Sequence, residues 1–295
     1  MAVPKKQERV IESILKGSAW FTILITIGII WVLLYETVIF FRHVSLIEFF
    51  TATEWTPLFS IKKYGILPLL TATFLTSFIA IAVALPLGLT IAIYLSEYAN
   101  PAFRRTVKPV LELLASIPTV VYGFFALTTI TPFLQSFIPG MAGFNALSPG
   151  IVMGIMIMPL ITSLSEDALY AIPGSMRFAS YALGASRFQT TFRVLLPAAS
   201  SGIGVSVILA ISRAIGETMI VAIAAGQQPR LTLNPLVPVE TITTYIVQVS
   251  MGDVPQNSPE FRSIFAAGMV LFLFTFGINN LGLYLKRKFY RKYEL

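Results

Sequence analysis

The sequence predicts an all-α membrane protein with six transmembrane helices. Its 295 residues are 56% hydrophobic and only 12% charged, about half the charged fraction of a typical soluble domain. Several apolar runs reach the length of about 20 residues that a helix needs to cross a bilayer. We expect six spans, at residues 18–41, 65–95, 107–130, 149–171, 198–226 and 263–285.

The net charge of +7 is distributed in a way that indicates membrane topology rather than nucleic-acid binding. With the N-terminus placed inside, most of the 21 Lys and Arg residues fall in cytoplasmic segments, as the positive-inside rule requires. We therefore expect a multi-pass protein of the cell (inner or plasma) membrane with both termini in the cytoplasm. Its basic ends would contact anionic membrane lipid, and we expect no nucleic-acid partner.

The composition argues against an enzyme. There is no cysteine and a single histidine, His43, so a thiol nucleophile and a Cys- or His-based metal site are not expected. The chain also lacks the G-x-x-x-x-G-K-[ST] phosphate loop, so any ATP would have to be bound and hydrolysed by another protein. We expect no catalytic residue, no metal and no cofactor in this chain.

Four segments follow from the hydropathy and charge pattern. Residues 1–17 are charged with an apolar face, which predicts an amphipathic helix lying on the inner membrane surface. Residues 18–64 contain the first span and an outer loop, and residues 65–285 form the core. Residues 286–295 are a basic cytoplasmic tail.

Hydroxyl residues and a proline mark the second and third spans. Thr76 and Ser77 lie within the second span, and Thr119 follows Pro118 in the third. Small hydroxyl side chains allow helices to pack closely, and they can also line a polar path, so both roles stay open here. Pro118 interrupts the helical hydrogen bonds and frees carbonyl groups, which only protein or water can satisfy at membrane depth.

The fifth span carries two charges near its middle, Arg213 and Glu217, and Thr218 follows them. A spacing of four residues predicts that both charged side chains share one helix face. An Arg at the centre of a bilayer costs roughly 2.5–3.5 kcal/mol on insertion scales, so the pair must face protein, a water-filled cavity or a ligand. The pair could fix the helix against its neighbours or bind a substrate on its pathway.

The cytoplasmic segment 166–197 predicts two short amphipathic helices that meet at a bend at Gly184. Pro173 and Gly174 end the fourth span, and Pro197 suits the first turn of the fifth. Each short helix has one apolar face, and basic residues lie among its other positions. They could lie among lipid headgroups or dock a cytoplasmic partner.

This segment resembles the cytoplasmic "EAA" loop of permease subunits in binding-protein-dependent ABC importers. In that loop a Gly is followed by nine residues and then by I-x-L-P; here Gly184 is followed by nine residues and Val194-Leu195-Leu196-Pro197. The sequence departs at Phe178-Ala179-Ser180, where E-A-A is expected, so the Glu of that motif is missing here. The resemblance implies that an ATPase would be contacted by Phe178, Ala179, Ser180, Gly184, Ala185, Leu196 and Pro197.

Three segments narrow the resemblance to the permeases of the phosphate-specific importer, the PstC-like rather than the PstA-like type. They are ASIPTVVYGFFAL at 115–127, YALGASRFQTTFRVLLPA at 181–198 and SRAIGETMIVAIAAG at 212–226. In that family an Arg and a Glu of the RAxGET helix are important for phosphate passage, and they match Arg213 and Glu217. The resemblance implies a type I ABC importer permease fold with coupling helices and a substrate pathway that includes Arg213, Glu217, Thr218, Thr76, Ser77 and Thr119.

The same resemblance implies the partners. They are a second, PstA-like permease subunit, a PstB-like ATPase dimer that binds ATP and Mg²⁺, and an extracytoplasmic PstS-like phosphate-binding protein. Two alternatives remain: a permease for another oxyanion such as sulfate or molybdate, and a secondary transporter. A secondary transporter often shows inverted repeats with broken helices in both halves, and no internal repeat is evident in this sequence.

Overall fold

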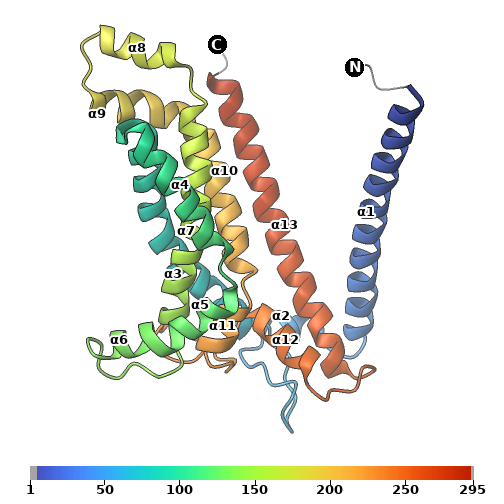
Figure 1. The fold of residues 1–295 in the computed structure, drawn as a ribbon. Helices are drawn as coiled ribbons and strands as arrows, with labels where there is room; N and C mark the ends of the chain where they lie inside the picture. Colours follow the sequence, from blue (N-terminus) through green and yellow to red (C-terminus); the bar gives the residue numbers. More distant parts are fainter. Residues whose placement is uncertain (1–4, 294–295) are drawn as a thin grey trace.

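The protein is a bundle of helices in a computed structural model that describes residues 5–293 (Figure 1). The helices are α1 (Lys5–Phe40), α2 (Leu46–Thr51), α3 (Leu67–Ile93), α4 (Pro101–Ser116), α5 (Thr119–Phe125), α6 (Thr131–Gln135), α7 (Leu147–Tyr170), α8 (Gly174–Ala182), α9 (Arg187–Thr190), α10 (Leu196–Ile215), α11 (Met219–Ala224), α12 (Ile242–Met251) and α13 (Pro259–Tyr293). Three short π-helical segments extend helices: η1 (Tyr94–Tyr98) follows α3, η2 (Ala126–Ile130) follows α5, and η3 (Thr191–Leu195) joins α9 to α10.

The predicted all-α membrane fold is confirmed. Within the described residues, five helices are long and apolar enough to cross a membrane, and a bent pair of helices brings the number to six. The bent pair is the predicted third span, which is not one straight helix: Pro101–Ser116 and Thr119–Gln135 meet at 86°. The bend lies at Ile117 and Pro118, which are extended, because Pro118 cannot continue the hydrogen-bond ladder.

The first helix also differs from the prediction. α1 runs without a break from Lys5 to Phe40, so the separate surface helix expected within residues 1–17 is continuous with the first span. Residues 1–4 lie outside the described part of the chain. The charged and apolar segments share good helix formers and no proline or cap separates them, so nothing ends the helix at the predicted boundary. At the other end, α13 extends the last span through most of the predicted 286–295 tail.

The centre of the bundle is the packing of α3 against α7, helped by glycines. A Cβ atom added at Gly154 of α7 would lie 2.8 Å from the carbonyl oxygen of Ala80 in α3. One added at Gly150 would lie 2.7 Å from Ile79. Only glycine permits this approach, so the G-x-x-x-G pattern at residues 150–154 here marks a close helix interface.

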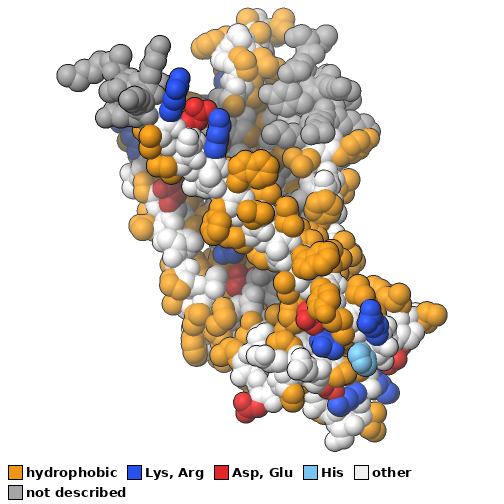
Figure 2. Space-filling view, turned by 90° about the vertical axis from the view of Figure 1, so that its right-hand side faces the viewer, with side chains coloured by type: hydrophobic (Ala, Val, Ile, Leu, Met, Phe, Trp, Pro, Cys, Tyr) orange, Lys and Arg blue, Asp and Glu red, His pale blue; other side chains and the backbone are white. Residues whose placement is uncertain are grey.

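α1 stands at the edge of the bundle and packs on α13 (Figure 1). Near its end, Glu36 accepts a hydrogen bond of 3.1 Å from Nε of Arg262. Most of α1 is exposed in the isolated chain. The side of the molecule that carries α1 is largely covered by hydrophobic side chains between charged groups near its two ends, as expected of a lipid-facing surface (Figure 2).

The two ends of the bundle are built differently. α8 and α9 lie across one end, and both described chain ends lie at that end as well (Figure 1). At the opposite end, α2, α12 and the loops around them cover the bundle. There Trp55 packs edge-on against Tyr245 of α12 with ring centroids 4.9 Å apart, inside an aromatic cluster with Phe49 and Tyr64.

Candidate functional site

The fifth span is interrupted next to its charges. α10 ends at Ile215, and Gly216, Glu217 and Thr218 separate it from α11. The prediction of one helix over 198–226 with both charges on one face is therefore wrong. Gly216 is a weak helix former, and the amide of Glu217 makes only a tight-turn bond of 3.2 Å to the carbonyl of Ala214.

Arg213 and Glu217 are brought together across this break. Nη1 of Arg213 lies 3.9 Å from Oε2 of Glu217, and Nη2 lies 3.9 Å from the sulfur of Met156 in α7. The Glu217 side chain is 4% exposed, whereas the Arg213 side chain is 51% exposed in the isolated chain. The guanidinium is thus held by one distant carboxylate and one weak acceptor, and most of its donors are open to another ligand.

Two threonines fix the backbone around the break. Thr243 of α12 donates a 2.8 Å hydrogen bond from its hydroxyl to the carbonyl of Glu217. Thr73 of α3 accepts a 3.1 Å hydrogen bond from the amide of Ile242, which lies at the start of α12. The start of α12 therefore binds to the bundle and supports the Glu217 backbone, a role that spacing along the sequence does not reveal.

Four further residues were predicted to line the pathway, namely Thr76, Ser77, Thr119 and Thr218. Thr76 donates to backbone carbonyls of its own helix, and the buried Ser77 hydroxyl has no partner among the described residues. Thr119 begins α5 after the bend and is half-buried, and the hydroxyl of Thr218 lies 3.4 Å from the carbonyl oxygen of Gly216. In the described residues, no hydrogen bond joins any of the four to Arg213 or Glu217.

The predicted coupling segment forms two helices with the expected bend. α8 ends at Ala182, and Gly184 adopts φ +80°, the left-handed conformation that glycine accepts without strain. The hydroxyls of Ser180 and Thr190 lie 2.9 Å apart and join α8 to α9. Ser186 caps α9 with a capping box that includes Gln189, so the corner is locked on both sides.

This corner exposes apolar side chains. Phe178 is 73% exposed and Leu183 is 89% exposed, and Phe188 is also exposed. Of the other residues that the resemblance named, Ala179 is exposed and Ala185 is half-buried, whereas Ser180 is buried. Leu196 and Pro197 are half-buried in the first turn of α10, which continues the helix from α9 through η3. The exposed apolar surface is therefore made by α8 and the start of α9.

One buried ion pair that sequence reasoning missed holds α8 in place. Nη2 of Arg177 in α8 lies 2.8 Å from Oε1 of Glu97 in η1. Arg177 also donates to the carbonyls of Ile172 and Leu169, at the end of α7. Glu97 is buried at the end of a long apolar span, and that single acid was the only signal in the sequence.

A second missed cluster lies at the same end. The buried carboxylate of Glu166 in α7 pairs with Arg104 and with Lys108, both in α4, and Lys108 lies 2.9 Å from Asp167. The guanidinium of Arg104 also sits 4.3 Å from the ring centre of Tyr170. The residues are about 60 positions apart, so only the packing of α4 on α7 reveals that they meet.

The sequence is similar to known permeases over most of its length. The family model described as "Binding-protein-dependent transport system inner membrane component" matches residues 84–290. A "Probable ABC transporter permease protein YqgH" of Bacillus subtilis is 40% identical over 79% of this chain and 75% of that protein. A "Phosphate transport system permease protein PstC" of Mesorhizobium japonicum is 34% identical over 81% of this chain and 77% of that protein.

Solved structures share the fold. A chain of a bacterial alginate ABC transporter in complex with an alginate-bound periplasmic protein superposes with a TM-score of 0.64, at 17% identity, over 96% of both chains. A chain of the MetNI methionine ABC transporter in an inward-facing conformation gives a TM-score of 0.56, at 20% identity, over 76% of this chain and 94% of that chain.

Proposed function

The chain belongs to the family of binding-protein-dependent transport system inner membrane components, and on that premise we propose that it is the PstC-like permease subunit of an inorganic phosphate importer. As a member of that family, it is a multi-pass permease subunit of an ABC importer. The proposal adds the substrate, phosphate, and the role of this subunit in forming half of the translocation pathway.

The observation that carries the proposal is the half-exposed guanidinium of Arg213 beside the helix break. A planar guanidinium donates parallel hydrogen bonds to an oxyanion. Its present partner, Glu217, is 3.9 Å away, so an arriving phosphate would replace a loose contact rather than a close ion pair. In our mechanism Arg213 turns from Glu217 to phosphate and returns after the anion leaves, which prevents the site from retaining its substrate.

We further propose that the α8–α9 corner docks an ATPase. Its exposed side chains, Phe178, Leu183 and Phe188, form an apolar surface suited to a protein groove, and the Arg177–Glu97 pair anchors α8 to the bundle. Because α9 leads through η3 into α10, a movement of the corner would be passed to the helix that carries Arg213 in its last turn. ATP and Mg²⁺ would be held by the ATPase.

The proposed assembly contains four further components: a PstA-like permease, two copies of a PstB-like ATPase and a PstS-like phosphate-binding protein. The α8–α9 end then faces the cytoplasm together with both chain termini, and the α2–α12 end faces outward. The basic residues at the α8–α9 end, such as Arg104 and Arg105, agree with this orientation under the positive-inside rule.

The closest competing function is import of another tetrahedral oxyanion, since one guanidinium binds phosphate, sulfate and molybdate alike. The deciding experiment is uptake of labelled phosphate and labelled sulfate by the assembled importer in cells that lack other phosphate and sulfate importers. We expect ATP-dependent phosphate uptake that excess sulfate does not inhibit. Uptake of sulfate but not phosphate would overturn the substrate assignment and leave the permease assignment intact.

A further inference from the structure

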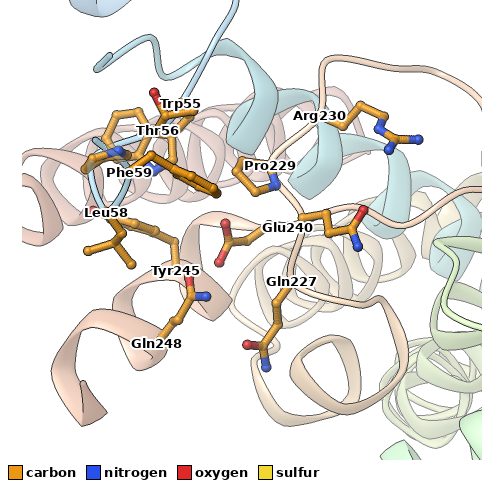
Figure 3. A pocket seen from close by; sticks show the side chains of 12 residues that line it. Trp55, Thr56, Leu58, Phe59, Gln227, Pro229, Arg230, Glu240, Tyr245 and Gln248 are labelled. Carbon is orange, nitrogen blue, oxygen red and sulfur yellow. The ribbon is translucent and has the colours of Figure 1, made fainter. Parts of the chain in front are cut away.

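A pocket of about 480 Å³ opens at the α2–α12 end of the bundle, opposite the α8–α9 corner. Its wall comes from the loop 55–59 and, far away in the sequence, from the loop 227–230 and the stretch from Glu240 into α12 (Figure 3). Apolar side chains such as Leu58 and Phe59 line much of it, with glutamines at its edge. This mixture of apolar walls and a few polar groups is typical of ligand pockets.

Two buried polar atoms belong to the wall of this pocket and have no partner among the described residues. One is Oε1 of Glu240, whose residue is 1% exposed, and the other is Nε1 of Trp55, also 1% exposed. Figure 3 shows the Glu240 carboxyl group directed toward the space between Phe59, Leu58 and Gln248. A buried donor or acceptor without a partner costs roughly 1–3 kcal/mol, so the pair indicates a ligand that supplies the missing contacts.

The charge of the pocket restricts the ligand. Burial raises the pKa of the Glu240 carboxyl to about 8, so it is mainly protonated and neutral at pH 7. Arg230 belongs to the rim, but its guanidinium points away from that carboxyl in Figure 3. The part of the pocket wall formed by the buried residues Trp55 and Glu240, called the deep part below, is therefore uncharged at neutral pH.

Charged ligands fit this deep part poorly. A cation would satisfy Glu240 but leave the indole N–H of Trp55 without an acceptor. An oxyanion would satisfy the indole but lose its hydration against Phe59 and Leu58, a loss that one N–H does not compensate. A ligand with one acceptor and one donor and no net charge satisfies both groups.

We propose that this pocket binds an amide group presented from outside the membrane, with its carbonyl oxygen accepting from Trp55 and its N–H donating to Glu240. The flanking apolar side chains hold the carbon atoms on either side of the amide, and Gln248 belongs to the lining of the same pocket. The amide has two sources: a free small solute, or a peptide segment of the extracytoplasmic binding protein. The second source rests on the proposed function.

The first experiment uses the purified full-length chain in detergent, with Trp55 emission as the reporter. Trp20 and Trp31 are exposed on α1, so Trp20→Phe with Trp31→Phe leaves Trp55 as the sole tryptophan. The probe is N-methylacetamide, and methyl acetate is the matched control, equal in size but without the N–H. We expect a saturable change in emission with N-methylacetamide and about three- to tenfold weaker binding of methyl acetate.

Variants test the two contacts. Glu240→Leu should weaken N-methylacetamide binding by a similar factor, Glu240→Gln should keep it, and Arg230→Gln at the rim should leave it unchanged. If Glu240→Gln still binds N-methylacetamide, the weaker binding of Glu240→Leu results from the lost contact and not from a lost fold. A non-saturable response, equal binding of methyl acetate, or tighter binding of n-propylammonium or inorganic phosphate would overturn the proposal and indicate a pocket filled by water or by a charged ligand.

A second experiment distinguishes the sources by measuring the affinity of the binding protein for the assembled importer. Weaker docking to Glu240→Leu, together with competition by N-methylacetamide, assigns the amide to a segment of the binding protein. If the binding protein docks equally well to Glu240→Leu, and the wild-type pocket still binds N-methylacetamide, the amide is assigned to a free solute. Because the first experiment needs neither transport nor partners, its result stands even if the chain imports another substrate.

Discussion

The guanidinium of Arg213 and the carboxylate of Glu217 lie 3.9 Å apart across a break in the helix. The Arg213 side chain is about half exposed, whereas the Glu217 side chain is buried. If the residues were one turn apart on a continuous helix, both would lie on the same helix face. The break instead lets the backbone of Glu217 be held by Thr243 while Arg213 remains on the last turn of α10. The backbone of the acid is therefore held in place while the guanidinium stays exposed, which suits a cation that alternates between two anions.

Arg213→Gln should abolish phosphate uptake, and Arg213→Lys should reduce it by at least tenfold, because an ammonium does not provide the bidentate contact. Uptake of labelled phosphate by the assembled importer measures both. Arg105→Gln, which removes an exposed arginine at the other end of the bundle, is the control and should keep wild-type uptake. Normal uptake by Arg213→Gln would contradict a direct role in transport.

Arg177→Gln should lower the free energy of unfolding by about 3 kcal/mol, because it leaves the buried Glu97 carboxylate without its counter-ion. Chemical denaturation in detergent gives this value. The double variant Arg177→Gln with Glu97→Gln should recover much of the loss, since neither charge then remains buried. If the single and double variants were equally destabilised, the pair would contribute packing rather than charge.

Gly184→Ala should destabilise the α8–α9 corner by about 1 kcal/mol, because alanine is strained at φ +80°. A Cβ there would meet no atom within 4 Å, so the cost comes from the backbone alone. The matched control is Gly204→Ala in α10, which is also free of contacts but helical, and which should stabilise the protein by about 0.5–1 kcal/mol. Thermal unfolding compares the two variants, and equal shifts of the melting temperature would contradict the backbone strain assigned to alanine at position 184.

Ala182→Cys should form a crosslink to the ATPase subunit, because this residue is exposed at the end of α8. The natural chain has no cysteine, so a single introduced thiol is unambiguous. Leu233→Cys, exposed in the loop between α11 and α12, serves as the control and should give no such product. Crosslinking is read by gel shift and mass spectrometry, and a product from Leu233→Cys alone would reverse the proposed orientation.

The Glu240 carboxyl makes stability depend on pH. Its pKa is about 8 in the folded protein against 4.5 for an unperturbed Glu, so the folded state binds more protons between these values. The free energy of unfolding should therefore fall as the pH rises from about 4.5 to 8, by up to about 1.4 kcal/mol per unit, and level off above 8.

Melting curves from pH 5 to 9 for wild type and Glu240→Gln test this dependence. The Gln variant should lose most of the slope, because it carries no proton to release. Glu54→Gln, which alters an exposed carboxylate at the same end, should keep the wild-type slope. Arg230 and Tyr245 line the same pocket, so a slope that persists in Glu240→Gln would assign the titration to another group.

The sequence predicted the helices well because hydropathy is a property of each segment by itself. It also predicted the bend at Gly184, since glycine is the residue that accepts positive φ there. The sequence did not predict the break in the fifth span, because that break depends on neighbouring helices. Gly216 alone is compatible with a continuous helix, and only the structure shows that α12 binds the Glu217 carbonyl. Pro118 was expected to disturb the third span, but the sequence did not predict the angle of 86° or the packing of α5 against α11 beyond the bend.

The candidate site was only partly predictable for the same reason. Arg213 and Glu217 were evident as charges in an apolar stretch, but the break between them was not. Glu97 and Arg177 are 80 residues apart, and Trp55 and Glu240 lie in different loops, so no local pattern joins them. Buried polar pairs of long range are the features that single-sequence reasoning cannot supply.

The packing of α1 on α13 has a consequence for biosynthesis. Glu36 and Arg262 are 226 residues apart, so α1 leaves the ribosome long before the helix to which it binds. At about 5–20 residues per second, α1 waits roughly 10–45 s in the bilayer before its partner is translated. During that interval Arg262 is not yet present to bind the carboxylate of Glu36, so α1 lies in the bilayer without its packing partner until α13 is made.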